Sequence, residues 1–461
     1  MRSVAVSSGW GICLALLSIA SAWAGGQGAL DTSFFGTGRQ VVSFDPTEAE
    51  QAIGVVALPD GKTLAASAIQ SGLNQTIALA RFRDNGAADT LFGNSGIVRI
   101  NLPVAYWREM KVGGDGKIVV VGTVVNSGSD YDMIVIRLLP DGSFDSTFAP
   151  GLFAGVTTVG FTSTGPTSYD YGEAVEIQND GKIVVVGSAT APQFGVAVVR
   201  LNVNGSLDTS FSGDGKLWVP VDLNGGATAQ GSSVTLAPAF IGTGDILVAG
   251  NAKYGTTGDR DFVILRVKPT GVLDTTFSGD GIATIAFDLG GNNVDLADSI
   301  SVPITNDAIL VAGSAADGAS TSRSVVAKLK LDGSLDTTFA STGKLSFGIA
   351  GQPTGYDGVV KVLAAFDGRV TMASRSTVFA VTRLLPNGSF DPSYGDGSAG
   401  LGQVAHAFFS NVPEVSQATC MTVDAQGRLL VAGFVDANDI DTGVMRLVGD
   451  RIFANGFQTT P

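Results

Sequence analysis

The stretch Leu273-Asp274-Thr275-Thr276-Phe277-Ser278-Gly279-Asp280-Gly281 decides the fold, because versions of it recur along the whole chain. Its first Asp returns seven times, at Asp31, Asp89, Asp145, Asp208, Asp274, Asp336 and Asp391. Successive copies are 55 to 66 residues apart, about 60 on average. A fixed period of this size indicates a repeat architecture, in which each unit packs mainly against its neighbours.

Each repeat predicts four short β-strands. The first strand follows Gly-x-Gly, as in residues 281–285, and an Asp-Gly turn such as Asp180-Gly181 separates the second from the third. Asp-Gly between apolar runs is a strong hairpin signal, because both turn residues need a positive φ. Small residues such as Gly187 are expected to end the third strand. The fourth strand carries a basic residue at a fixed place: Arg81, Arg137, Arg200, Arg266, Lys328, Arg383 and Arg446.

Seven such units predict an all-β fold, a seven-bladed β-propeller of four-stranded antiparallel blades. Ring closure leaves only short, protected sheet edges. An eight-bladed ring and an open β-solenoid are the alternatives. Because a residue present in every unit serves every unit, the motif aromatic is expected to wedge between blades. The motif Asp is expected to accept backbone hydrogen bonds and to pair with the basic residue of the fourth strand.

The two faces of the predicted ring differ in character. Strands of a meander alternate in direction, so the connections after strands two and four share one face. This constant face carries the near-identical Asp-Gly turns and motif segments. The connections after strands one and three form a variable face, whose loops differ in length and chemistry between units. Binding usually resides in variable loops on a fixed scaffold, so function is expected there.

The Gly-Ser-Leu-Asp-Thr-Thr-Phe and Asp-Gly-Lys-Ile-Val-Val-Val-Gly segments give the chain a family resemblance. It resembles the delta-60 repeat family of exported bacterial proteins over essentially all of residues 29–446. Local departures are Pro392 and Tyr394 in the last copy and Ala88 and Leu91 in the second. The resemblance implies a propeller-like fold and bacterial export, and it implies no particular activity.

Three segments are predicted. Residues 1–24 have the features of a signal peptide: Arg2, an apolar stretch from Ile12 to Ala20, and the small-x-small site Ala22-Trp23-Ala24. Residues 25–449 form the seven-repeat propeller, and residues 450–461 are a C-terminal tail. The expected product is secreted, either extracellular or periplasmic, after cleavage near Ala24. It is expected to have no transmembrane segment.

Composition narrows the partners. The formal net charge is −14, which argues against nucleic acid as a partner. An extracellular protein or a glycan remains a candidate partner. Cys420 is the only cysteine beyond the predicted signal peptide, so no disulfide is expected within the propeller.

The sequence offers little for catalysis. His406 is the only histidine, which excludes a multi-histidine metal site, and no phosphate-binding glycine loop or nucleophile-elbow motif occurs. A carboxylate pair is the remaining route to an enzyme, and Glu173 and Glu109 are its candidates because each follows an aromatic residue closely. We therefore favour a chain without catalytic activity.

Tyrosine and aspartate recur in the variable loops. Tyr can stack on an apolar surface and also form hydrogen bonds, which suits a sugar ligand. The candidates for such binding are Tyr131, Tyr169, Tyr171, Tyr254 and Tyr356. Three Asp-x-Asp pairs suit Ca²⁺, a hard cation that prefers oxygen ligands. They are Asp130 and Asp132, Asp259 and Asp261, and Asp439 and Asp441. No cofactor is required by the sequence, and solvated acidic turns are the alternative interpretation.

Three hypotheses of function follow. The favoured one is an exported binding or interaction propeller, with its ligand on the variable face. The second is a carboxylate-dependent hydrolase or lyase acting on a polysaccharide. The third is a structural component of the cell surface, attached through the C-terminal tail.

Overall fold

The computed structural model describes residues 26–127, 130–161, 168–191, 193–237, 244–256, 258–303, 308–353, 355–409, 415–436 and 440–449. The predicted signal peptide and C-terminal tail lie outside these ranges. Within them the structure contains no α-helix, and therefore no helix that could span a membrane.

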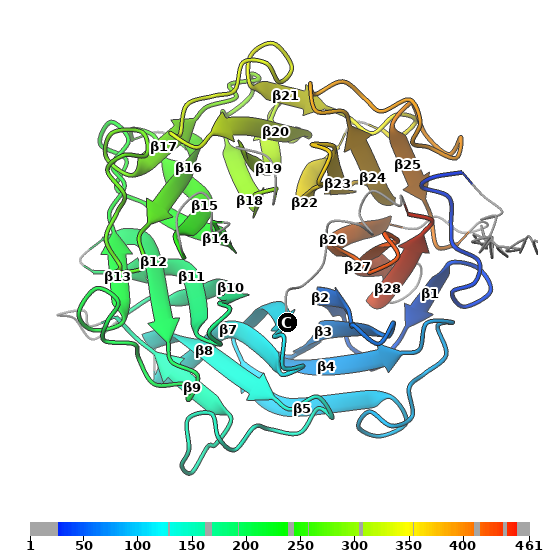
Figure 1. Cartoon of the computed structure of the whole chain (residues 1–461), viewed down its shortest axis with the longest axis horizontal. Helices are drawn as coiled ribbons and strands as arrows, with labels where there is room; N and C mark the ends of the chain where they lie inside the picture. Colours follow the sequence, from blue (N-terminus) through cyan, green and yellow to red (C-terminus); the bar gives the residue numbers. More distant parts are fainter. Residues whose placement is uncertain are drawn as a thin grey trace, which may run out of the picture.

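The chain forms seven four-stranded antiparallel sheets arranged around a ring (Figure 1), which confirms the predicted seven-bladed β-propeller. From the inner to the outer strand, the blades are β2 (Glu50–Ala57) to β5, β6 to β9, β10 to β13, β14 to β17, β18 to β21, β22 to β25, and β26-β27-β28-β1. The further bounds of blades 1 to 3 are β3 (Thr63–Ser71), β4 (Asn74–Phe82), β5 (Ile97–Val104), β6 (Tyr106–Val112), β7 (Ile118–Ser127), β8 (Asp130–Leu138), β9 (Val156–Val159), β10 (Tyr171–Ile177), β11 (Ile183–Thr190), β12 (Phe194–Leu201) and β13 (Lys216–Val219).

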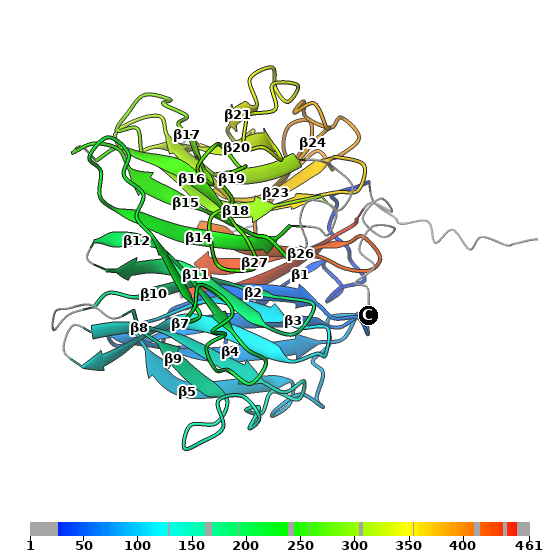
Figure 2. The same cartoon turned by 60° about the vertical axis from the view of Figure 1, so that its left-hand side comes forward.

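The strands of blades 4 to 7 have the bounds β14 (Ala229–Leu236), β15 (Ile246–Lys253), β16 (Arg260–Val267), β17 (Ile282–Ile285), β18 (Asp295–Ser301), β19 (Ala308–Ala316), β20 (Ser322–Lys330), β21 (Lys344–Phe347), β22 (Gly358–Ala364), β23 (Val370–Arg375), β24 (Phe379–Leu384), β25 (Gln403–His406), β26 (Val415–Val423), β27 (Leu429–Asp436), β28 (Ile440–Leu447) and β1 (Arg39–Val42). In the turned view of Figure 2, the strands run between two sides of the ring, where turns and loops gather.

The repeat and the blade are offset by one strand. The first strand of each repeat is the outer strand of the preceding blade, so the interpretation of each repeat as one blade was wrong. The ring closes through this offset, because β1 pairs with β28 from Arg39 opposite Met445 to Val42 opposite Thr442. This closure rules out the open solenoid, and the count of blades rules out the eight-bladed ring.

The hydrophobic core is divided into seven clusters, each shared by two neighbouring blades. The motif aromatic lies in a different cluster in each repeat and is at most 3% exposed. These residues are Phe34, Phe92, Phe148, Phe211, Phe277, Phe339 and Tyr394. Burying such a ring stabilises the interface by roughly 1.5–3 kcal/mol. The prediction that the motif aromatic wedges between blades is therefore confirmed.

On the constant face, an ion pair between the motif Asp and a basic residue recurs beside the motif aromatic in each blade, and we call this arrangement the polar clasp. In all seven blades the basic residue of the third strand, which is the fourth strand of each repeat, approaches the motif Asp to 2.7–3.2 Å. In blade 3, Arg200 also lies over the ring of Phe211 at 4.8 Å and donates to the carbonyl of Pro269 in the next blade, at 2.7 Å. Asp208 accepts from the backbone N–H of Ser210. Burial opposes ionisation of Asp208, but the hydroxyl of Ser210 and the cations hold its pKa well below the usual range.

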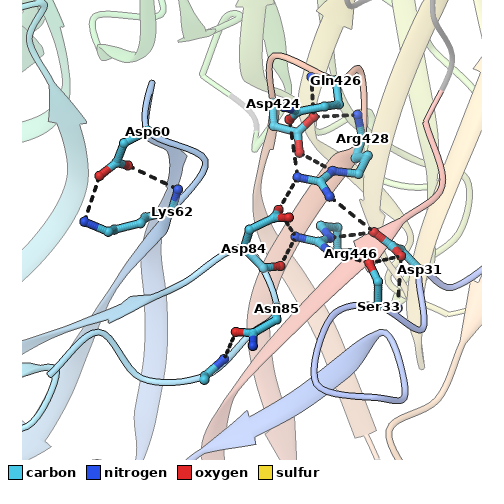
Figure 3. Close-up of polar contacts among 11 residues, drawn as sticks. Asp31, Ser33, Asp60, Lys62, Asp84, Asn85, Asp424, Gln426, Arg428 and Arg446 are labelled. Atoms are coloured by element: carbon cyan, nitrogen blue, oxygen red, sulfur yellow. Dashed lines mark hydrogen bonds and ion pairs between the residues drawn. The ribbon is translucent and has the colours of Figure 1, made fainter. Parts of the chain in front are cut away.

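Figure 3 shows this clasp where the ring closes. Arg446 of blade 7 contacts Asp31 at 2.8 Å and donates to the backbone carbonyl of Asp84 in blade 1 at 2.6 Å. Arg428 contacts both Asp424 and Asp84 beside it. Charge-assisted hydrogen bonds thus join blade 7 to the segment before β1 and to the turn after β4, in addition to the backbone pairing of β1 with β28.

The third strand of each repeat, which is the second strand of its blade, does not end at its small residue, contrary to the prediction. Gly187 lies within β11, opposite a β-bulge in β10 between Gly172 and Ala174. A Cβ atom at Gly187 would lie 1.8 Å from the carbonyl oxygen of Tyr171. Glycine is required because the inner strand bulges toward it, and the strand continues past it.

Candidate functional site

The variable face is organised by buried acids at the start of several inner strands. Asp170, Asp295 and Glu50 are each at most 1% exposed. Each accepts a hydrogen bond from the backbone N–H of an aromatic residue at the start of the connection from the preceding blade. Those aromatics are Phe161, Phe287 and Phe44. Burial raises the pKa of both Glu50 and Asp295 to about 7. These acids fix the positions of the residues where the loops begin, so the side chains farther along the loops are presented on a fixed scaffold.

Four aromatic residues of blades 2 and 3 gather on this face, and we call them the tyrosine patch: Tyr131, Tyr169, Tyr171 and Phe194. All four are half-buried. Tyr131 and Tyr169 stack with ring centroids 5.6 Å apart, and the ring of Tyr171 lies 11° from parallel with that of Phe194. Burial, and then the neighbouring Tyr131, raise the pKa of Tyr171, so its hydroxyl is neutral at physiological pH.

Local backbone pairing fixes the patch. The N–H of Tyr131 donates to the carbonyl of Ser168 at 2.9 Å, and the N–H of Asp170 donates to the carbonyl of Tyr131 at 3.0 Å. Tyr169 therefore lies opposite Tyr131 in a parallel bridge. The Asp170 carboxylate also accepts a hydrogen bond from the Ser168 hydroxyl at 2.9 Å, which holds this loop in place.

A charged pair lies beside the patch on the inner strands. Arg108 approaches Glu173 at 3.1 Å and lies 4.7 Å from the ring centroid of Tyr106, which is 41% exposed. Burial raises the pKa of Glu173, and Arg108 opposes that shift. Both residues occupy the bulge position of their strands. The predicted catalytic candidate Glu173 is thus one member of an ion pair at the edge of an aromatic surface.

The other catalytic candidate, Glu109, belongs to a charge network in the middle of the ring. Its carboxylate lies 3.9 Å from Lys111, which also contacts Glu176 at 3.3 Å, so a second acid is close. Lys361 of blade 6 reaches Glu109 of blade 2 at 3.6 Å, and these blades are not neighbours. Burial opposes protonation of Lys111, but Glu176 and Glu109 outweigh it and raise its pKa. Glu109 also accepts from the N–H of Val175 at 2.9 Å, so the network braces the inner strands.

The remaining tyrosine candidates lie apart from the patch. Tyr254 is 42% exposed and pairs with Leu223 in a bridge at another blade junction. Tyr356 is 67% exposed and lies opposite Ser322. Phe194 and Tyr106 were missed from the sequence because no Asp stands beside them. Each is the first residue of its strand, β6 for Tyr106 and β12 for Phe194, and this position at the variable face is the sequence feature that could have identified them.

The three Asp-x-Asp pairs differ in their surroundings. Asp259 and Asp261 are joined by Asp288, which the sequence analysis did not select. Asp288 follows Phe287 in the adjacent loop of the same face. Its place on that face is the sequence feature that could have identified it as a candidate. In blade 2, Asp132 accepts a hydrogen bond from Asn126, and Asp130 begins β8. In blade 7, Asp441 is the second residue of β28 and lies opposite Val435 in β27, while Asp439 lies outside the described residues.

Three other features lie away from the variable loops. Burial raises the pKa of Cys420 to about 12, which keeps the thiol protonated. His406 lies in β25, the outer strand of blade 6 and not a strand of the last blade. A hollow of about 210 Å³ on the constant face lies between blades 1 and 2, lined mainly by apolar groups around Leu58 and Pro140.

Comparison with known proteins supports the repeat assignment. Five segments match the model of a β-propeller domain of unknown function, DUF5122: residues 113–148, 178–211, 242–277, 306–339 and 367–394. Each segment runs from the Asp-Gly turn region to the motif aromatic. The chain is a propeller-repeat protein. The repeats fill the ring described above, and no curated protein matches the chain.

Several solved structures resemble the propeller. A protein of unknown function from Dyadobacter fermentans is 10% identical with a TM-score of 0.43, covering 89% of this chain and 98% of that one. The polysaccharide lyase Uly1 is 10% identical with a TM-score of 0.47, covering 86% and 89%. An ulvan lyase of family PL25 is 12% identical with a TM-score of 0.42, covering 92% and 94%. Similarities of this strength carry no information about ligand or reaction.

Proposed function

We propose that this propeller is an exported, non-catalytic binding protein whose ligand is a carbohydrate held on the variable face by the tyrosine patch. The observation that carries the proposal is the gathering of Tyr131, Tyr169 and Tyr171 with Phe194 in stacked and tilted arrangements. Half-buried rings keep fixed orientations while offering one apolar surface and a polar hydroxyl edge. Pre-organised rings lose little conformational freedom on binding.

The charges nearby favour a neutral glycan. Arg108 is already paired with Glu173, so the edge of the patch supplies matched donors and acceptors for hydroxyl groups. The net charge of −14 disfavours a polyanionic polysaccharide. A neutral or weakly charged oligosaccharide is the ligand class that fits both features.

Export is the second part of this proposal. It is motivated by Arg2, the apolar stretch from Ile12 to Ala20, and the site ending at Ala24. The resemblance of the repeats to the delta-60 type supports it. Mass spectrometry of the protein from a secreting bacterial host should find a mature N-terminus near Gly25. Recovery of an unprocessed chain in the cytoplasm would contradict export.

Binding is tested with a glycan array followed by calorimetry on the best oligosaccharide. Tyr169→Ala should weaken binding at least tenfold, which corresponds to about 1.4 kcal/mol. Tyr169→Phe should retain most affinity if stacking dominates. Tyr356→Ala is the matched control, because that ring is exposed and outside the patch. Absence of binding to every neutral glycan, or equal affinities for Tyr169→Ala and the control, would refute the assignment.

The same preparations test the enzymatic alternative. A hydrolase would release reducing ends from the bound polysaccharide, and a lyase would produce unsaturated ends that absorb ultraviolet light. Either product, if abolished by Glu173→Gln or Glu109→Gln, would replace the binding proposal with a catalytic one. We expect neither product, since each carboxylate is engaged by a neighbouring cation.

A further inference from the structure

Three carboxylates, from the start of β16 and from the connection between β17 and β18, converge at the junction of blades 4 and 5. Asp259 precedes β16, Asp261 lies in it, and Asp288 belongs to the connection between β17 and β18. One oxygen from each lies within 4.8 Å of the others. Asp288 has a φ of 49°, in the left-handed region that Asp tolerates better than most residues. This unusual backbone carries a third negative charge toward the other two.

Asp261 is the unusual member of the group. It is only 8% exposed, and among the described residues its carboxylate is acted on by burial and by the charges of Asp259, Asp288 and Lys344, with no hydrogen-bond donor. A buried carboxylate is normally paired or hydrogen-bonded, because leaving it without donors is costly. Its counterpart in blade 2, Asp132, is hydrogen-bonded by Asn126. Blade 4 therefore has a buried acceptor aimed at two other acids, where blade 2 has a side-chain donor.

A fourth acid lies next to the group. Asp295 is fully buried, and while its Oδ2 accepts from the N–H of Phe287 at 2.6 Å, its Oδ1 has no hydrogen-bond partner among the described residues. Negative charge from Asp261 and Asp288 contributes to the raised pKa of Asp295, after burial. The acids thus act on one another electrostatically.

The nearby cations are directed elsewhere. The ammonium of Lys344 donates to the carbonyl of Ala286 at 2.6 Å and lies over the ring of Phe287. Arg260 donates to the side-chain oxygen of Asn251 at 2.9 Å. Lys344 partly offsets the charge on Asp261 through space, but it does not donate to that carboxylate.

We propose that Asp259, Asp261 and Asp288 bind a divalent cation, and that this cation is Ca²⁺. The donor set is all oxygen, without the His or Cys that zinc and other softer metals prefer. Ca²⁺ accepts irregular loop geometry and additional carbonyl or water ligands, whereas Mg²⁺ requires a near-ideal octahedron. The site is separate from the tyrosine patch, so it does not depend on the carbohydrate proposal.

The experiment uses the whole purified protein after chelation and measures melting temperature with Ca²⁺ or Mg²⁺ added, together with calcium calorimetry. A dissociation constant of about 10⁻⁴ to 10⁻³ M is expected, as for other extracellular calcium modules. Addition of 10 mM Ca²⁺ should raise the melting temperature by a few degrees, and Mg²⁺ should raise it less.

Asp261→Asn is the decisive variant, because it removes one charge without changing the size of the side chain. Without metal it should melt at or above the wild-type temperature, since a buried repulsion is relieved. With Ca²⁺ it should melt below the wild type, so the order of the two proteins reverses. Asp132→Asn is the matched control and should keep the full calcium response.

Reversal of this order supports the site even if carbohydrate binding is never found. An unchanged wild-type melting temperature in 10 mM Ca²⁺, or an undiminished response in Asp261→Asn, would overturn the proposal. A calcium response lost equally in Asp132→Asn would also overturn it, because the binding would then lie elsewhere.

Discussion

Replacing Arg200 with Met tests whether the polar clasp holds neighbouring blades together. Arg200 is 5% exposed and makes three contacts: Nε with Asp208 at 2.7 Å, Nη1 with the carbonyl of Pro269 at 2.7 Å, and Nη2 with the hydroxyl of Ser210 at 3.2 Å. Hydrogen bonds to charged groups contribute about 1.5–3 kcal/mol each, and a buried carbonyl left without a donor costs about 1–3 kcal/mol.

Two features reduce the loss. Lys182 remains 3.0 Å from Asp208, so the carboxylate keeps a cation. Met also fills much of the space above Phe211. Breaking a buried pair usually costs about 3–5 kcal/mol, and we expect Arg200→Met to destabilise the protein by about 3 kcal/mol. Arg200→Lys should cost roughly half as much, because Lys328 occupies the same place in blade 5, at 3.1 Å from Asp336.

Urea unfolding followed by tryptophan fluorescence measures these losses as shifts of the midpoint at constant slope. Asp180→Asn is the control, because Asp180 is exposed and its carboxylate is as far as 3.9 Å from the Lys182 ammonium. This substitution should change stability by less than about 0.5 kcal/mol. A loss below about 1 kcal/mol for Arg200→Met, or equal losses for the Met and Lys variants, would refute the clasp reasoning.

Two further predictions concern the buried acid Glu50 and the glycine at the bulge. The raised pKa of Glu50, about 7 in the fold against 4.5, stabilises the protein below pH 4.5, and this contribution is lost as pH rises through 7. Melting temperature should therefore increase from pH 8 to pH 5, and Glu50→Gln should reduce that slope; an unchanged slope would contradict the assignment. Gly187→Ala should cost about 2 kcal/mol or more and also weaken glycan binding, since its Cβ would displace Tyr171. Gly114→Ala, in open space, is the control, and equal denaturation midpoints would count against the bulge argument.

The sequence predicted the number of blades because each unit repeats its own turn and interface residues. It did not reveal the blade boundary, since hydrogen bonding between strands leaves no mark in a periodic sequence. The strand beginning at Lys216 is adjacent in the chain to the motif at Asp208 but completes the sheet of β12. Mid-strand glycines such as Gly187 were mistaken for strand ends, because the bulge that requires them lies on the partner strand.

The candidate sites were predicted only in part for a similar reason. Tyr131, Tyr169 and Tyr171 were selected as variable-loop residues, and the structure brings them together across blades 2 and 3. Asp288 joins its group through loop conformation, which depends on the buried acid Asp295. Loop conformation of this kind is not encoded in strand periodicity.

The one-strand offset between repeat and blade has a consequence for biogenesis. β1 leaves the ribosome before all the other propeller strands, yet its partner β28 leaves after them. Until the final repeat is synthesised, β1 has no sheet to join, because the other three strands of the seventh blade belong to that repeat. Nascent chains therefore carry an unsatisfied edge for nearly the whole of synthesis, and any premature stop leaves it permanently available for pairing between molecules.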